Sequence, residues 1–230
     1  MNEIRDKIVE GLKNSQWDKE LSHYWESDRF LHTLTQLHQY TLEKKRFTPG
    51  LKDAFRFLKE CPFSTVKVVI FIDDNCNTLL NMGIPFSQDF NKMPIVEFSE
   101  GLKRECKRSD VKTFLKKVIE REKKAFDYSL LEWCKQGVLI IPYALTTRVD
   151  GNPHYDLWSE FRARIVDTVN TSFPDIPWVL VNTRTIKMES YISSKNVITF
   201  KPFDYTNQPD WSMLVNNILK AKKEKPIKWA

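Results

Sequence analysis

The chain has 230 residues, of which 41% are hydrophobic and 29% charged, and its formal net charge is +6 at pH 7. This composition excludes a disordered chain and indicates a globular protein with a full core. No apolar run approaches the roughly 18–20 residues that cross a bilayer, and the first residues lack the apolar centre of a signal peptide. We therefore expect a single cytoplasmic domain over residues 1–230, with no membrane contact.

Residues 1–46 are expected to form a helical segment, and residues 47–230 an α/β core. Thr48-Pro49-Gly50 breaks the first helical pattern, and a second helix is expected over Leu51–Glu60. Amphipathic stretches at helical spacing follow over Val111–Lys135 and Trp158–Val169. Four apolar runs bounded by turn residues have strand character: Val66–Ile72, Gly137–Ile141, Trp178–Val181 and Val197–Phe200. The alternation predicts a three-layer α/β/α fold with a central four-stranded parallel sheet.

Polar segments follow each predicted strand. Open parallel sheets bind their ligands beyond the carboxyl ends of the strands. Four segments should therefore meet at one edge of the sheet: Asp73–Asn77, Pro142-Tyr143, Asn182–Arg184 and Lys201–Tyr205. We expect the functional site at this edge.

The four cysteines show no CxxC spacing and the four histidines no HExxH pairing. Reduced thiols without a metal or another cofactor are therefore expected. Lysine and arginine pairs recur along the chain, for example Lys44-Lys45-Arg46 and Lys123-Lys124. They are compatible with a polyanionic partner, but composition alone favours the simpler interpretation as solvated helix faces.

Several ordered segments resemble the uracil-DNA glycosylase superfamily, most closely its family-1 members, over roughly residues 47–229. The segment FTPGLKDAFRFLKECPFSTVKVVIF resembles that family's lead-in helix and first strand, and MGIPFSQ resembles its Gly-Leu-Cys-Phe-Ser segment. LLEWCKQGVLIIPYALTTR is similar to its Trp-Ala-Lys-Gln-Gly-Val-Leu-Leu-Leu-Asn stretch. PHYDLWSEF and KPIKWA resemble a later helix start and the family's terminus. The resemblance implies the fold of that superfamily.

The catalytic positions implied by the resemblance are altered. Asp74 aligns with the aspartate that activates water, and Lys201 replaces the histidine near the leaving base. A carboxylate below C1′ can stabilise the sugar cation and orient water, and a cation near O2 can stabilise the departing anion. Asp74 as a turn cap and Lys201 as a surface lysine stay open as alternatives. Asp73 is either a second acid, accepting from the exocyclic amine of a cytosine-type base, or a solvated turn residue; a one-residue shift in alignment would exchange it with Asp74.

The implied base-recognition positions differ as well. The tyrosine that blocks C5 substituents corresponds to Cys76, the asparagine that pairs with uracil corresponds to Pro142, and Phe86 aligns with the phenylalanine that stacks on the base. Losing the ring opens the C5 side, and losing the amide removes the group that selects uracil. The expected base pocket consists of Asn75, Cys76, Asn77, Phe86, Pro142, Tyr143 and Asn182.

The expected DNA contacts lie around this pocket. Thr183 and Arg184 replace the family's Gly-Ser phosphate loop, and Lys92 is a further phosphate contact. Phe203 or Tyr205 is expected to be the wedge that fills the vacated base stack. His154 and Trp158 are expected to begin and pack a helix, with no catalytic role.

The predicted function is that of a monomeric, monofunctional DNA glycosylase acting on double-stranded DNA. It would flip and excise a pyrimidine with a bulky C5 substituent, such as glucosylated hydroxymethylcytosine, and leave an abasic site. In a bacterium this would be an anti-phage defence, and in a phage a processing activity. The alternative is a catalytically inactive DNA-binding or replication-accessory protein with the same fold.

Overall fold

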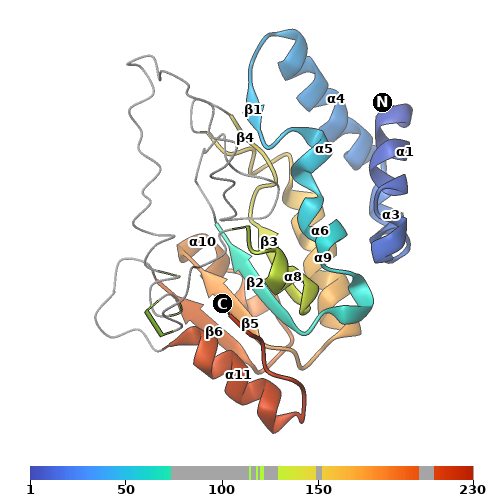
Figure 1. The fold of residues 1–230 in the computed structure, drawn as a ribbon. Helices are drawn as coiled ribbons and strands as arrows, with labels where there is room; N and C mark the ends of the chain where they lie inside the picture. The colour runs from blue at the N-terminus through green and yellow to red at the C-terminus, as the bar shows by residue number, and fades with distance from the viewer. Residues whose placement is uncertain are drawn as a thin grey trace.

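The computed structural model describes residues 1–73, 129–148, 152–201 and 210–229, together with residues 114, 118, 120 and 121. Its centre is a four-stranded sheet in the order β3-β2-β5-β6 with every neighbouring pair parallel. The strands are β2 (Val68–Ile72), β3 (Val138–Pro142), β5 (Trp178–Val181) and β6 (Val197–Phe200). The four predicted strands and the parallel sheet are therefore confirmed (Figure 1).

Helices cover both faces of this sheet. All residues of β2, β3 and β5 are buried, as expected for parallel strands with helices on either side. The chain passes from β2 to β3 in one direction along the sheet and from β3 to β5 in the other. Because such connections are right-handed, α8 (Leu131–Lys135) and α9 (Ser159–Ser172) lie on opposite faces. The predicted three-layer architecture is confirmed.

The chain that precedes β2 packs aromatic side chains against α9. Trp25 contacts Phe30, Phe55 and Phe161 through ring pairs, with centroids 5.2, 5.4 and 6.2 Å away. Each such pair adds roughly 0.5–1.5 kcal/mol beyond the burial of its area. The elements are α1 (Asn2–Glu10), η1 (Lys13–Ser15), α2 (Trp17–Glu20), α3 (Ser22–Trp25), α4 (Asp28–Leu42), α5 (Leu51–Ala54), α6 (Arg56–Glu60) and η2 (Phe63–Thr65).

Two predicted helices differ in detail from those observed. The expected helix over Leu51–Glu60 is divided at Phe55 into α5 and α6. The amphipathic stretch Val111–Lys135 does not continue as one helix, because Leu130 has a left-handed backbone with φ of 56° just before α8. The spacing of apolar residues indicates which side chains are buried. It does not predict where a single residue changes the direction of the backbone and ends a helix.

A second, two-stranded sheet was not predicted. In it β1 (Phe47–Thr48) pairs antiparallel with β4 (Thr147–Arg148). Strands of two residues carry too little alternation to give a sequence signal. They tie the start of the α/β core to the segment that follows β3, near the edge where the site was predicted (Figure 1).

The turn that enters β3 depends on Gly137. Its φ is +93°, and a Cβ at this position would collide with the carbonyl oxygen of Thr65. The Gly137 carbonyl also accepts hydrogen bonds from the backbone N–H groups of Lys67 and Val68, at 2.9 and 3.2 Å. This close approach sets the register of β2 against β3.

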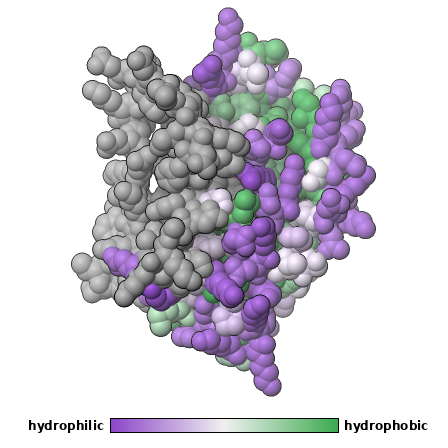
Figure 2. All heavy atoms as spheres, viewed as in Figure 1, coloured by the Kyte–Doolittle hydropathy of each residue, from purple (hydrophilic) through white to green (hydrophobic). Residues whose placement is uncertain are grey.

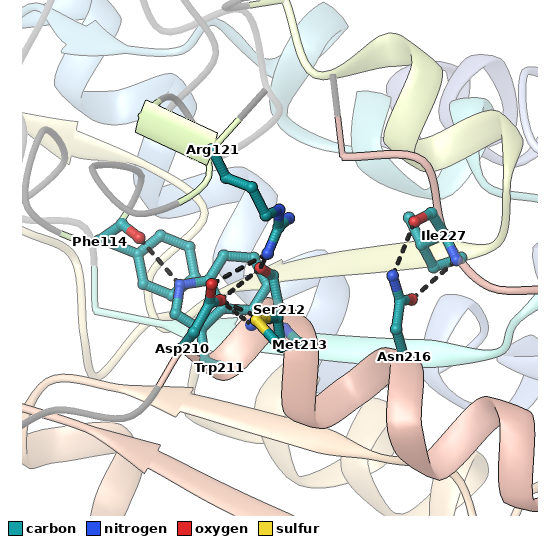
Figure 3. Close-up of polar contacts among 8 residues, drawn as sticks. All are labelled: Phe114, Arg121, Asp210, Trp211, Ser212, Met213, Asn216 and Ile227. Carbon is teal, nitrogen blue, oxygen red and sulfur yellow. Dashed lines mark hydrogen bonds and ion pairs between the residues drawn. The ribbon is translucent and has the colours of Figure 1, made fainter. Parts of the chain in front are cut away.

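The C-terminal helix α11 (Trp211–Ala221) is fixed by capping and aromatic stacking. The Asp210 carboxylate caps the first turn of this helix. It also forms an ion pair with Arg121, whose Nη1 lies 2.9 Å from Asp210 Oδ2 (Figure 3). Trp211 stacks on Phe114 at 4.4 Å between centroids and donates to the Phe114 carbonyl. In the middle of the helix, Asn216 exchanges two hydrogen bonds with the Ile227 backbone (Figure 3). The helix is thereby held against both the chain preceding α8 and the chain end.

On the face that Figure 2 shows, the described surface over the N-terminal helices is mainly hydrophilic, with hydrophobic residues between them. Within the described ranges, no helix has the length and apolar composition to cross a bilayer. The remaining elements, α10 (Thr183–Ile186) and η4 (Glu189–Tyr191), connect β5 to β6.

Candidate active site

The ends of the parallel strands bring three predicted segments into hydrogen-bonding contact. The Tyr143 backbone N–H donates to the Ile72 carbonyl at 2.7 Å, and the Asn182 N–H donates to the Phe200 carbonyl at 3.0 Å. The Asn182 side-chain amide donates to the Asp73 carbonyl at 2.7 Å. The predicted meeting of the strand ends at one edge is therefore confirmed for the residues that the structure describes.

Asp73 is the acidic centre of this edge. The residue is 5% exposed, so it is not the solvated turn residue that the sequence left open. Its Oδ1 accepts a hydrogen bond from the Tyr155 hydroxyl at 2.9 Å, and its Oδ2 lies 3.2 Å from Arg184 Nε. Each carboxylate oxygen thus has one donor, and an ionised carboxylate offers about four acceptor positions in all.

Burial dominates the electrostatics of this group. It raises the pKa of Asp73, and the Tyr155 hydrogen bond and the charges of Arg184 and Arg162 offset part of the rise. Burial and the nearby Asp73 carboxylate raise the pKa of Tyr155, which therefore keeps its proton and can donate it. A buried carboxylate held by a hydroxyl and a guanidinium is the result.

Arg162 holds two segments of this edge together through their backbone carbonyls. It is 9% exposed, and its Nη1 donates to the Tyr143 carbonyl at 2.8 Å and to the Tyr155 carbonyl at 2.7 Å. Its guanidinium carbon also lies 4.2 Å from the centre of the Tyr143 ring. One side chain of α9 therefore joins the segment after β3 to the segment that carries Tyr155.

Pro142 ends β3 opposite Ile72 and is buried. Its ring has no hydrogen-bonding group and its nitrogen carries no hydrogen. Proline is tolerated here because β3 is an edge strand of the sheet. Tyr143, the next residue, is partly buried and stacks on Phe71 with centroids 5.8 Å apart. The end of this strand thus offers an aromatic ring and no side-chain amide.

The three residues of this edge that were predicted to contact phosphate or the leaving base lie nearer the solvent. Thr183 and Arg184, at the start of α10, and Lys201, directly after β6, are all exposed. The Arg184 guanidinium lies 4.5 Å from the centre of the Tyr155 ring while it pairs with Asp73. Asn182, which precedes α10, has a positive φ of 80°. Arg184 therefore spans the distance from a buried acid to the surface.

Eight predicted site residues lie outside the described residues. They are Asp74, Asn75, Cys76, Asn77, Phe86, Lys92, Phe203 and Tyr205. Their roles stay predictions.

Tyr155 and Arg162 were not among the residues predicted from the sequence. Arg162 carried a signal, because it stands four residues after Trp158 and four before Val166, in the middle of the apolar stripe of α9. A charged residue on a buried stripe needs partners and marks a polar network. Tyr155 carried none, since an isolated tyrosine in a loop has no distinguishing pattern.

His154 has the packing role that was predicted. It is buried, its Nδ1 lies 2.8 Å from Thr146 Oγ1, and its ring stacks on Tyr40 at 5.2 Å. Trp158 donates to the same Thr146 hydroxyl and immediately precedes α9. Both residues anchor the start of this helix.

No metal centre is apparent among the residues that the structure describes, where no group of three His, Cys, Asp or Glu side chains could hold an ion. Cys61 and Cys134 are buried free thiols. Burial raises the pKa of Cys134 to about 12. These two thiols are therefore structural in character.

No model of a protein family matches the sequence. Curated relatives do: a uracil-DNA glycosylase of Mesomycoplasma hyopneumoniae is 24% identical over 203 residues, covering 81% of this chain and 85% of that protein. One of Clostridium perfringens is 27% identical over 186 residues, covering 79% and 76%.

Solved structures of uracil-DNA glycosylases share the fold. The mimivirus enzyme superimposes with a TM-score of 0.73 at 21% identity, over 95% of this chain and 88% of that one. The wild-type UNG of Nitratifractor salsuginis gives a TM-score of 0.55 at 16% identity, over 93% and 92% of the two chains.

Proposed function

We propose that this chain is a monofunctional DNA glycosylase of the uracil-DNA glycosylase superfamily, and that its substrate is a pyrimidine with a bulky C5 substituent. The curated uracil-DNA glycosylases that are 24% and 27% identical to most of the chain, and the solved structure that shares its fold, support a glycosylase of this kind. Glucosylated 5-hydroxymethylcytosine is the representative substrate. The enzyme acts as a monomer of one domain on double-stranded DNA, extrudes the base and leaves an abasic site. In a bacterium such an activity would remove the modified bases of infecting phage DNA in the cytoplasm.

The observation that carries this proposal is the position of Pro142. The resemblance aligns this residue with the asparagine that selects uracil, and in the structure it ends β3 next to the edge that holds Asp73. A proline side chain can neither donate to nor accept from a base. Selection of uracil by an amide at this position is therefore lost, and another group must recognise the base.

The proposed reaction is hydrolysis of the N-glycosidic bond. Asp74 orients and deprotonates a water molecule, whose oxygen forms a bond to C1′ while the bond from C1′ to the base breaks. The electron pair leaves with the base. Lys201 stabilises the resulting anion, and its place directly after β6 at the edge of the sheet supports this role.

The proposed DNA contacts surround this centre. Arg184, Thr183 and Lys92 bind backbone phosphates, and Phe203 or Tyr205 fills the vacated base stack. Phe86 stacks on the extruded base, with Asn75, Cys76, Asn77, Tyr143 and Asn182 around it. The exposure of Arg184 and Thr183 supports phosphate contact from the start of α10.

The test is base release from synthetic duplexes. Duplexes that contain uracil, thymine, cytosine, hydroxymethylcytosine or its glucosides are incubated with the protein, and released bases are identified by mass spectrometry. Release of the glucosylated base, abolished by Asp74→Asn with DNA binding retained, is the expected result. Release of uracil alone contradicts the proposal. DNA binding without release of any base supports the inactive DNA-binding alternative instead.

A further inference from the structure

The Asp73 carboxylate is held in place by groups that can only give it hydrogen bonds. Arg184 Nε, 3.2 Å from Oδ2, has no acceptor capacity, and the Tyr155 hydroxyl donates to Oδ1 at 2.9 Å. The side-chain amide of Asn182 donates to the carbonyl of the same residue at 2.7 Å. Three donors from two neighbouring segments therefore converge on one acid at the end of β2.

This convergence determines which hydrogen-bonding groups around Asp73 are already engaged. The Tyr155 hydroxyl and one N–H of the Asn182 amide are engaged with Asp73, while Asn182 keeps a second N–H and its amide oxygen. Pro142, across the sheet from Ile72, adds no donor. The carboxylate has acceptor positions beyond the two that Tyr155 and Arg184 occupy. Asp73 is thus an acceptor at this edge.

The two classes of pyrimidine differ in the group that meets such an acceptor. Cytosine-type bases carry an amino group at C4, which donates hydrogen bonds, whereas uracil-type and thymine-type bases carry a carbonyl oxygen, which accepts. A carboxylate oxygen facing the amino group gains a charge-assisted hydrogen bond. Facing a carbonyl oxygen, it leaves two buried acceptors opposed, which is costly.

We infer that Asp73 recognises the 4-amino group of the extruded base, so that the substrate class is a cytosine-type pyrimidine. This inference rests on the proposed glycosylase function and adds a specificity to it. Tyr155 and Arg184 are positioning residues, because they hold the carboxylate without contacting the base. Arg162 acts one step further away, by fixing the backbone carbonyl of Tyr155.

The decisive test uses wild-type protein and two duplexes that differ only at position 4 of one base. One contains glucosylated 5-hydroxymethylcytosine and the other glucosylated 5-hydroxymethyluracil, with the same sugar linkage and sequence. Single-turnover rates should favour the cytosine-type base by at least about tenfold, since one base gains a hydrogen bond to a charged acceptor and the other opposes two acceptors. Equal rates overturn the inference and leave the proposed function standing. Release of neither base overturns both.

Variants then assign the discrimination to Asp73. Asp73→Asn should bring the ratio of the two rates close to one, because an amide can turn either its donor or its acceptor to the base. Tyr155→Phe should reduce the ratio partly, since it removes one anchor of the carboxylate. Asp175→Asn, the same change at an exposed position just before β5, is the matched control and should keep the wild-type ratio. A wild-type ratio in folded Asp73→Asn would overturn the assignment.

Discussion

Arg162 offers a sharp test of the network behind the candidate site. In Arg162→Met, a side chain of similar length loses its charge, so the Tyr143 and Tyr155 carbonyls lose their common donor. Hydrogen bonds to a charged group contribute roughly 1.5–3 kcal/mol each, and a partly buried cation over an aromatic ring about 1 kcal/mol. These contributions share one guanidinium and do not add fully. We expect a loss of about 3–4 kcal/mol in the free energy of unfolding.

Arg164, two residues further along α9, is the matched control. It is exposed and pairs with Glu160 one turn earlier, at 2.8 Å. Such a pair contributes roughly 0.3–0.5 kcal/mol, and Arg and Met have similar helix propensities. Urea denaturation of Arg162→Met and Arg164→Met at pH 7 measures the difference directly. For a chain of this length, about 3–4 kcal/mol corresponds to roughly 6–16 °C in Tm.

If the free energies of unfolding of Arg162→Met and Arg164→Met differ by less than about 1 kcal/mol, the predicted role of Arg162 is wrong. It would mean that water replaces the guanidinium at both carbonyls without cost, and that the residues are not joined through Arg162. A large loss confined to Arg162→Met would show that the tyrosine-bearing segments depend on one buried cation.

Three further outcomes are expected. The pKa of Asp73 is higher in the folded than in the unfolded state, so the folded protein binds the proton more tightly. The free energy of unfolding of the wild type should therefore fall, relative to that of Asp73→Asn, as the pH rises above about 4. Urea titrations of both proteins from pH 3.5 to 7 measure this, and a difference in unfolding free energy that does not change with pH would contradict it. Gly137→Ala should cost more than about 3 kcal/mol by urea denaturation through its positive φ and its blocked Cβ position, whereas Gly50→Ala, with φ of −65° and open space, should cost less than about 1 kcal/mol. If Arg184 contacts a phosphate, Arg184→Gln should reduce the slope of log affinity for DNA against log salt concentration by about 0.9. Lys195→Gln changes an exposed residue just before β6 and should leave this slope unchanged. Equal slopes for the two variants in salt titrations would contradict the phosphate contact.

The strands were predictable because their signal is local. Each is a short apolar run between turn residues, and burial on both faces makes such runs nearly continuous, as in Val68–Ile72. The position of the site was predictable for a related reason, since parallel strands bring their carboxyl ends to a single edge. The residues just after one strand therefore lie near the residues just after its neighbours.

The contacts within the site were not predictable in the same way. Tyr155 meets Asp73 across 82 positions of sequence, and the contact depends on where the tertiary fold places the residues just before α9. No pattern of spacing encodes that path. Leu130 and Asn182 illustrate the same limit, because each has a positive φ that a non-glycine residue adopts only when the surrounding structure imposes it.

The interdependence of the edge residues bears on whether the proposed site has been kept for a function. Random loss would leave a buried acid without partners, and an unpaired buried charge is strongly destabilising. Asp73 instead has a donor on each oxygen, and Arg162 holds the segment that supplies one of them. Stability alone does not require such a network, because well-packed apolar side chains of similar volume often do as well or better. A paired, buried acid at this edge of the sheet therefore supports the proposed recognition of a base, which the paired duplexes test.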